Sequence, residues 1–328
     1  MTAEPWRGLH VAVTGASGFL GGRLAAALAA SGARVSGFGR RAHHDLPGCA
    51  YASWDIEAGP LASAPDGVDA VVHCAGRVTD WGKRAAFFRC HVEGTRHVLA
   101  SFPTCPIVHV STASVYDPFT PKRGIREDAP PTARYLNAYA ESKAATETVV
   151  RTRERHIILR PHAIYGPGDH VLLPRLLEAL IFGWLIAVGD GDNPISLTHV
   201  DNLVDAILLA LGASVANAAC GTFNIADAAP VRLDAALRAV LKANGHTPRI
   251  VYLPKRLAWG LGGALETLYR ACGASRAPRL TRYRVAQVAD EYNLDCSKAA
   301  SILGYAPTRD LFGYLAAAND ERRTSSIS

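Results

Sequence analysis

"VAVTGASGFLGGRL" at residues 11–24 decides the fold class of this chain. A short apolar run leads into a turn with Gly15, Gly18 and Gly21, and the residues that follow have the composition of a helix. "ARVSGFG" at residues 33–39 is strand-like again, which completes a β–α–β unit. Glycines at this point let backbone N–H groups approach a pyrophosphate at the helix N-terminus. We therefore predict a dinucleotide site here, because a turn shaped only by packing does not need three glycines at this spacing.

Similar alternation of strand-like and helix-like segments continues to about residue 165. Short apolar runs that open into small or polar residues occur in "DAVVHCAG" (69–76), "PIVHVSTASVY" (106–116) and "RHIILRP" (155–161). Apolar runs joined by helices are typical of strands buried on both faces. The sequence predicts an α/β fold with a doubly wound, Rossmann-type parallel sheet.

Glycine and proline punctuation and long apolar stretches, which we interpret as helices, follow residue 165. Ligands of open α/β sheets bind beyond the carboxyl ends of the strands, so this smaller C-terminal part is predicted to form a substrate-binding lid. We expect residues 1–165 to form the NADP(H)-binding domain, with 196–227 returning to it. The lid is then 166–195 and 228–320, and the polar residues 321–328 are expected to be a flexible tail.

Composition excludes several classes of protein. The chain has 328 residues, 49% of them hydrophobic and 20% charged, which suits a globular protein. It shows neither an uncharged apolar run of about 18 residues nor a secretory leader, so we expect a cytoplasmic protein. The formal charge of +6 is dispersed, which argues against nucleic acid. Seven scattered cysteines indicate reduced, buried thiols and no metal site.

The end of the second predicted strand bears on the choice of cofactor. A carboxylate at this point would hold the ribose hydroxyls of NAD, whereas arginine suits the extra phosphate of NADP. The sequence has Gly39 followed by Arg40 and Arg41. We predict that NADP(H) is preferred and that NAD(H) is the alternative. The same residues are also compatible with an exposed basic turn without a ligand.

Two further segments carry candidate chemistry. "HVSTASVYD" (109–117) ends a predicted strand in hydroxyl residues, which can polarise a carbonyl but are also common at strand ends. "AYAESKAATE" (138–147) places Tyr139 and Lys143 four residues apart, on one face of a predicted helix. Any helix with a polar face produces such pairs, so the spacing alone leaves a solvated face and a proton-transfer pair both open.

Taken together, these motifs resemble the extended short-chain dehydrogenase/reductase superfamily. "TGASGFLG", "STASVY", "YAESK" and "LRPHAIYGPGD" stand in the expected order over nearly the whole chain. "VVHCAGRVTDWG", "HVEGTRHVL", "GDGDNPISLTHVDNLVDAILLAL", "LTRYRV" and "LGYAP" are similar to the branch of 3β-hydroxysteroid dehydrogenases, sterol-4-carboxylate dehydrogenases and 2-alkyl-3-ketoacid reductases. The resemblance implies an NAD(P)-dependent oxidoreductase.

The resemblance also implies roles for individual residues. Tyr139 is the expected general acid/base, Lys143 its partner and Thr112 the substrate-orienting hydroxyl, with Ser111 as the substitute for Thr112. A nearby ammonium lowers the pKa of a phenol, which fits the pairing of lysine with tyrosine. The cofactor-binding residues implied are Gly15, Ser17, Gly18, Phe19, Leu20, Gly21, Arg40, Arg41, Asp55, Ile56, Cys74, Ala75, Gly76, Ser111, Tyr139, Lys143, Pro161, His162 and Ile164.

The chain departs from the superfamily pattern at two positions. His91 stands where relatives have asparagine, which in them supports a turn and a proton-relay water; a lone histidine is more often structural than catalytic. Ala138 replaces a common proline, a change that affects only helix entry. His162 and His170 are equally compatible with substrate contact and with a purely structural place in their loop.

Function is predicted less closely than fold. The apolar stretches 172–189 and 256–273 fall in the lid, where they either pack on the core or face a lipophilic substrate or a membrane surface. We expect interconversion of a secondary alcohol and a ketone on a steroid-like or long-chain 3-keto or 3-hydroxy acid substrate, by a homodimer. The alternatives are a nucleotide-sugar epimerase or dehydratase, which would need a diphosphate-binding basic cluster that we do not identify in the lid, and a nonenzymatic dinucleotide sensor.

Overall fold

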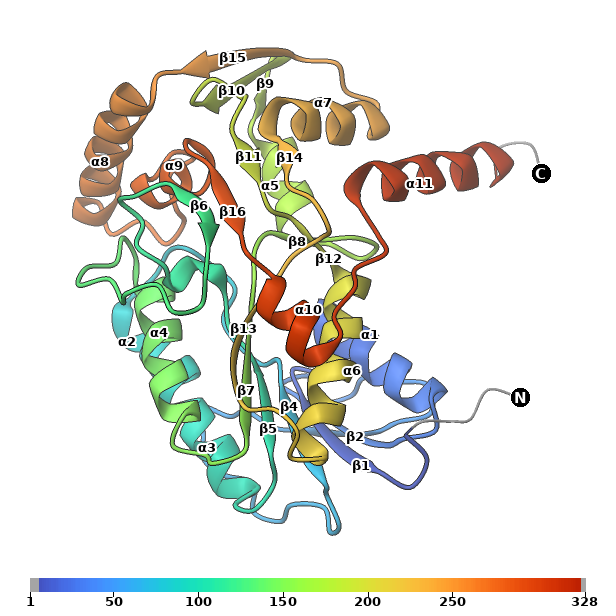
Figure 1. The fold of residues 1–328 in the computed structure, drawn as a ribbon. Helices are drawn as coiled ribbons and strands as arrows, with labels where there is room; N and C mark the ends of the chain where they lie inside the picture. The colour runs from blue at the N-terminus through green and yellow to red at the C-terminus, as the bar shows by residue number, and fades with distance from the viewer. Residues whose placement is uncertain (1–5, 326–328) are drawn as a thin grey trace.

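The computed structural model describes residues 6–325, and a seven-stranded sheet lies at its centre (Figure 1). All neighbouring strands of this sheet are parallel. Their order is β13 (Gly221–Ile225), β7 (His156–Pro161), β5 (Ile107–Val110), β4 (Ala70–His73), β1 (His10–Thr14), β2 (Arg34–Gly39) and β3 (Ala50–Ser53). The predicted doubly wound parallel sheet is confirmed.

Helices cover both faces of the sheet, which is why its strands are apolar at consecutive positions. Val11 and Val13 of β1 pack into one core cluster, whereas Ala12 between them packs into the other. The first face is covered by α1 (Phe19–Ala30), α6 (Val200–Val215) and α10 (Ser297–Leu303). The second is covered by α2 (Arg84–Phe88), a π-helical turn (Arg89–Glu93), α3 (Gly94–Ser101) and α4 (Ala138–Val150).

The smaller part of the molecule contains three short sheets (Figure 1). They are β15 (Arg249–Leu253), β10 (Trp184–Val188) and β9 (Leu180–Ile181); β14 (Val231–Arg232), β11 (Pro194–Ile195), β16 (Tyr292–Leu294) and β6 (Lys122–Ile125); and β12 (Thr198–His199) with β8 (Ile164–Tyr165). Its helices are α5 (Leu172–Glu178), α7 (Leu233–Ala243), α8 (Lys255–Ala271), α9 (Arg282–Val288) and α11 (Leu311–Ser325). In the segment 196–227, β13 is a strand of the large sheet and α6 packs on that sheet. β6, although it lies within the first 165 residues, pairs with β16 of the smaller part.

The interpretation of 172–189 as helical is wrong after Glu178. α5 ends there, and β9 and β10 form a tight hairpin whose two turn residues, Phe182 and Gly183, have φ values of 47° and 79°. The two-residue hairpin turn whose twist matches that of the strands, type I′, requires a positive φ at both of its central residues. Gly183 adopts the second of these without strain. α11 is helical to Ser325, and the flexibility expected from residue 321 stays a prediction. Residues 326–328 lie outside the described part.

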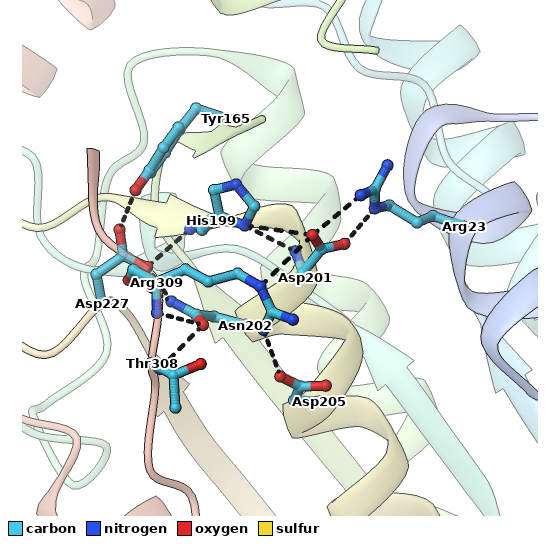
Figure 2. Close-up of polar contacts among 9 residues, drawn as sticks. All are labelled: Arg23, Tyr165, His199, Asp201, Asn202, Asp205, Asp227, Thr308 and Arg309. Atoms are coloured by element: carbon cyan, nitrogen blue, oxygen red, sulfur yellow. Dashed lines mark hydrogen bonds and ion pairs between the residues drawn. The ribbon is translucent and has the colours of Figure 1, made fainter. Parts of the chain in front are cut away.

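Polar contacts at the start of α6 tie the C-terminal segment to the large sheet (Figure 2). Asn202, fully buried, donates to Asp227 and to the Arg309 carbonyl oxygen and accepts from the Arg309 N–H. Asp201 binds Arg23 of α1 through both carboxylate oxygens and lies 3.6 Å from Arg309. These contacts fix the segment before α11 against α1 and α6, and we assign them a structural role.

Candidate functional site

The glycine-rich turn lies where the strand order of the large sheet reverses. In the large sheet, β2 and β3 lie on one side of β1, and β4 and β5 lie on the other. In open α/β sheets ligands bind beyond the carboxyl ends of the strands at this switch point, which here are the ends of β1 and β4. Gly15 has a φ of 74°, and a Cβ there would lie 2.8 Å from the Ala75 nitrogen. A Cβ at Gly21 would overlap the Gly15 carbonyl oxygen. The glycines therefore allow the loops after β1 and β4 to meet closely.

The start of α1 fits a dinucleotide pyrophosphate. The helix begins after Gly18, and within the described chain no side chain caps its first turn and that turn carries no acidic residue. Its first N–H groups and positive dipole end are thus available to an anion. Phe19 and Leu20 are half-buried in this turn, and the Phe19 ring lies edge-on to His170, 5.9 Å between ring centroids.

The adenosine side of the site combines predicted residues from β2 and the loop after β3. Gly39 is closely surrounded by side chains, because a Cβ would lie 2.5 Å from Ser17 Oγ and 2.9 Å from Tyr51 Oη unless these side chains moved. Arg40 and Arg41 follow and are exposed. Of the two residues predicted to lie beside the adenine, Asp55 is exposed, whereas Ile56 is buried against Gly94.

α4 carries Tyr139 and Lys143 on one face. Asn137 caps the helix by accepting from the Ala140 N–H at 3.0 Å, which replaces the proline expected near Ala138. Lys143 is buried and its Nζ donates to the Val110 carbonyl oxygen at 2.7 Å. Burial lowers the pKa of Lys143 to about 8, and Gly76 lies beside its Nζ.

The phenol of Tyr139 is tuned by groups from three elements. Burial raises its pKa, while an interaction with the Thr112 side chain and the positive charge of Arg175 act in the opposite direction. A buried, neutral phenol at neutral pH can donate a proton to a substrate oxygen, and a hydroxyl beside it can orient that oxygen.

Ser111 and Thr112 point to different partners. Thr112 follows β5, and its Oγ1 donates to Ser114 Oγ at 3.2 Å. The Ser111 hydroxyl instead donates to Glu147 at 2.7 Å inside the protein. Thr112 is therefore the hydroxyl beside Tyr139, because consecutive residues at a strand end face opposite sides, and a contact of Ser111 with the cofactor stays a prediction.

His91 supports the catalytic helix through its ring nitrogens. Nε2 accepts from the Arg77 N–H at 2.9 Å, so Nδ1 carries the proton and donates to Ser142 Oγ at 2.8 Å. Ser142 in turn donates to the Tyr139 carbonyl oxygen at 2.9 Å. Burial lowers the pKa of His91 to about 3, so the ring is neutral. It lies in the π-helical turn, a local irregularity that is frequent at functional sites.

The loops after β4 and β7 contain the remaining predicted residues. Cys74 and Ala75 follow β4, and burial raises the pKa of the Cys74 thiol to about 12, so it is not a nucleophile. Pro161 ends β7 and Ile164 begins β8. Between them His162 stacks on Tyr292, 3.8 Å between centroids, and Nδ1 donates to the Ser196 carbonyl oxygen. These contacts hold the His162 ring in place, and its predicted contact with the cofactor stays a prediction.

Three lid-side or loop residues escaped the sequence analysis. Tyr283 of α9 places its hydroxyl 2.9 Å from Ser114 Oγ, beside Thr112. Asp80, in the loop after β4, is buried and paired with Arg284 and Arg175. Their partners are up to 204 residues away. Two motifs noted in the sequence contain them: "LTRYRV" holds Tyr283 and Arg284, and "VVHCAGRVTDWG" holds Asp80.

Comparison with known proteins places the chain in a family. The profile of the NAD dependent epimerase/dehydratase family matches residues 11–226. The chain belongs to this family. A 2-alkyl-3-oxoalkanoate reductase of Shewanella oneidensis is 32% identical over 317 residues, which cover 90% of this chain and 82% of the relative. A sterol-4-alpha-carboxylate 3-dehydrogenase (decarboxylating) of Mus musculus is 28% identical over 313 residues, 90% of this chain and 86% of the relative.

Solved structures of the family share the fold. The UDP-glucuronic acid 4-epimerase of Bacillus cereus in complex with NAD superposes with a TM-score of 0.71 at 21% identity, covering 97% of this chain and 99% of that one. The predicted superfamily and branch are confirmed. So is the prediction of an NAD(P)-dependent enzyme of the dehydrogenase/reductase class, because the family is NAD-dependent and the relatives are named as reductases and dehydrogenases.

Proposed function

We propose that this member of the family is an NADP(H)-dependent reductase that interconverts the keto and hydroxyl groups of a long-chain 3-oxo or 3-hydroxy acid. The observation that carries the proposal is the meeting of Thr112, Tyr139 and Lys143 at the carboxyl ends of β4 and β5. A sensor needs none of these three groups. The sequence relatives over 90% of the chain, a 2-alkyl-3-oxoalkanoate reductase among them, support a carboxylated substrate.

The residues divide the chemistry between them. When bound, the nicotinamide supplies or accepts the hydride. Thr112 and Tyr139 hydrogen-bond the carbonyl oxygen, and the Tyr139 hydroxyl gives that oxygen its proton during reduction. The Lys143 ammonium stabilises the phenolate that remains. His91, through Ser142, holds the first turn of α4 so that the phenol keeps its position.

The preference for NADP(H) rests on the end of β2. Gly39 lacks the carboxylate that would bind the ribose hydroxyls of NAD, and a side chain there would require Ser17 and Tyr51 to move. Arg40 and Arg41 are exposed beside it and available to a phosphate.

The test of the function is nicotinamide absorbance with a panel of 2-alkyl-3-hydroxy acids, 3-hydroxysteroids and UDP-sugars. Each compound is run with NADP and with NAD. We expect turnover of the hydroxy acids, with a KM for NADP about 10-fold or more below that for NAD. This ratio corresponds to the free energy of one charge-assisted hydrogen bond to the extra phosphate. Replacing Arg40 and Arg41 by serine removes the preference. Conversion of a UDP-sugar without net change in absorbance, and no oxidation of the acids, would instead favour the epimerase alternative.

A finer proposal concerns the outer face of the β9–β10–β15 sheet, which we propose contacts a membrane surface. Ile181 and Trp184 pair across β9 and β10, and Ile186 pairs with Val251 of β15. These four side chains are 38–59% exposed, and Phe182 at the hairpin tip is 99% exposed. Since alternate residues of a strand share a face, they form one apolar surface.

Charge complements this apolar face. Residues 242–284, which include β15, α8 and most of α9's first turn, hold nine lysine or arginine residues and one acidic residue. This basic cluster in the lid was missed in the sequence analysis. Arg284, Arg282 and Lys255 are paired with acidic residues, so only the other cations are expected to contribute, at about 1 kcal/mol each near an anionic bilayer. Within the described chain, no helix combines the length and apolar character needed to cross a bilayer.

Vesicle sedimentation tests the membrane contact. We expect the protein to sediment with phosphatidylserine-containing vesicles and less with neutral ones, because residues 242–284, which include β15, carry an excess of basic residues. Replacing Phe182 and Trp184 by serine is expected to weaken binding about 10-fold or more, since two large apolar side chains are lost. Phe312→Ser on α11, 46% exposed in the wild type, is the control. Equal binding by all three proteins would exclude this face as the contact.

A further inference from the structure

Arg175 is a positively charged side chain on a mainly apolar lid helix, whose other charged residue is the exposed Glu178 at its end. Four of the seven residues of α5 are leucine, and all seven are at least partly exposed. Among the described residues, the ion pair of Arg175 is with Asp80, where Nη2 and Oδ1 are 3.6 Å apart. This separation exceeds hydrogen-bond distance, so the guanidinium donors remain available to another acceptor.

Asp80 is already neutralised by a stronger partner. Arg284 Nε lies 2.7 Å from one carboxylate oxygen and Nη2 lies 3.3 Å from the other. Its Nη1 donates to the carbonyl oxygens of Pro278 and Arg279. Asp80 and Arg284 therefore form a neutral, anchored pair, and Arg175 adds one net positive charge beside them.

This surplus charge lies close to the reacting hydroxyls. Tyr283, next to Arg284 in the chain, reaches Ser114 and so Thr112. The charge of Arg175 lowers the pKa of both Tyr139 and Tyr283, against the larger effect of burial. The cation, the two phenols and the Thr112 hydroxyl thus lie near one another beyond the end of β5.

We propose that Arg175 binds the carboxylate of the substrate and is the residue that selects a 3-oxo or 3-hydroxy acid over a neutral ketone or alcohol. The inference rests on the proposed function. In a 3-oxo acid the carboxylate is separated from the keto carbon by a single carbon, so the cation that binds it must be near the proton donor. A guanidinium suits this task because it can make two parallel hydrogen bonds to one carboxylate. The leucines of α5 offer an apolar wall to the alkyl chains.

The test compares a 2-alkyl-3-hydroxy acid with its methyl ester, which has the same carbon skeleton without the charge. In the full-length protein with NADP, Arg175→Met is expected to lower kcat/KM for the acid about 10- to 100-fold, the value of one charge-assisted contact. The ester is expected to change little. Arg175→Lys is expected to restore part of the activity on the acid, and so part of the discrimination, because an ammonium keeps the charge but not the two parallel hydrogen bonds.

A matched control separates charge from position. Arg270 on α8 has an equally weak ion pair, 3.9 Å to the buried Glu266, so Arg270→Met removes one lid charge of the same kind. Arg270→Met is expected to leave the ratio of kcat/KM for the acid to kcat/KM for the ester unchanged. Equal losses on acid and ester in Arg175→Met would overturn the inference and leave the proposed function intact. Failure of the wild type to oxidise either compound, with Arg175-dependent binding of UDP, would overturn both and assign Arg175 to a diphosphate.

Discussion

Tyr139→Phe is expected to lower kcat about 10²- to 10⁴-fold, which is the contribution of a positioned proton donor. The ring remains in place, so the edge-on contact with His91, 5.8 Å between centroids, is kept and only the hydroxyl is lost. Affinity for NADP, measured by fluorescence titration, is expected to stay near the wild-type value. The decrease in kcat is therefore expected to come from the chemical step, which single-turnover stopped-flow absorbance measures directly.

Neighbouring phenols provide the controls. Tyr283→Phe removes a hydroxyl bonded to Ser114 and is expected to have a smaller effect, because that hydroxyl orients Thr112 and does not supply the proton. If Tyr283→Phe abolishes turnover while Tyr139→Phe does not, the assignment of the donor is wrong.

The pH profile supplies a second check on the donor. Lys143 has its pKa lowered to about 8 by burial, so its ammonium is present below that pH and lost above it. The kcat/KM for ketone reduction is therefore expected to fall as pH rises through about 8.

Local patterns were sufficient to predict the β–α–β unit and the helix that carries Tyr139 and Lys143, whereas the roles of the individual cofactor-binding residues stay predictions. Gly15 and the helix after it are adjacent in sequence, and Tyr139 and Lys143 are one helical turn apart, so spacing alone determines which groups meet. The parallel sheet then brings the ends of β1, β4 and β5 to one edge. The choice between Ser111 and Thr112 needed the structure, because it depends on which face of the strand end each side chain takes.

The lid was much less predictable, since its contacts join distant residues. β10 pairs with β15 about 65 positions later, and this pairing turns an apolar stretch that reads as helix into a hairpin. Asp80 meets Arg284 across 204 residues, and Tyr283 meets Ser114 across 169. No periodicity in the sequence marks such pairs. The carboxylate-binding proposal for Arg175 therefore depended on the structure.

Glu147 is another residue that only the structure identified, and its replacement is expected to have the largest effect on stability. It is 2% exposed and accepts from Arg160 at 2.9 and 2.6 Å, from Ser111 at 2.7 Å and from Arg151 at 2.8 Å. It joins α4 to β5 and β7 beneath the catalytic residues. Glu147→Gln leaves the buried Arg160 guanidinium without its counter-charge, which is expected to lower the free energy of unfolding by about 3–5 kcal/mol.

Urea denaturation at several pH values measures this effect and its origin. The Arg160 guanidinium holds the pKa of Glu147 below its ordinary value of 4.5, although burial opposes it. A carboxyl with a lowered folded pKa stabilises the protein fully above its unfolded pKa and loses that contribution as the pH falls through the folded value. The difference in the free energy of unfolding between wild type and Glu147→Gln should therefore be constant above about pH 5.5 and become smaller below pH 4.5.

The partner charge decides how this loss arises. In Glu147→Gln combined with Arg160→Met the uncompensated cation is gone, so the double variant is expected to lose less stability than the sum of the two single variants. Glu141→Gln, at the exposed pair with Arg84 on the same helix, is the control and is expected to change stability little. Additive losses, or a gap that does not depend on pH, would mean that Glu147 stabilises α4 by packing and not by its charge.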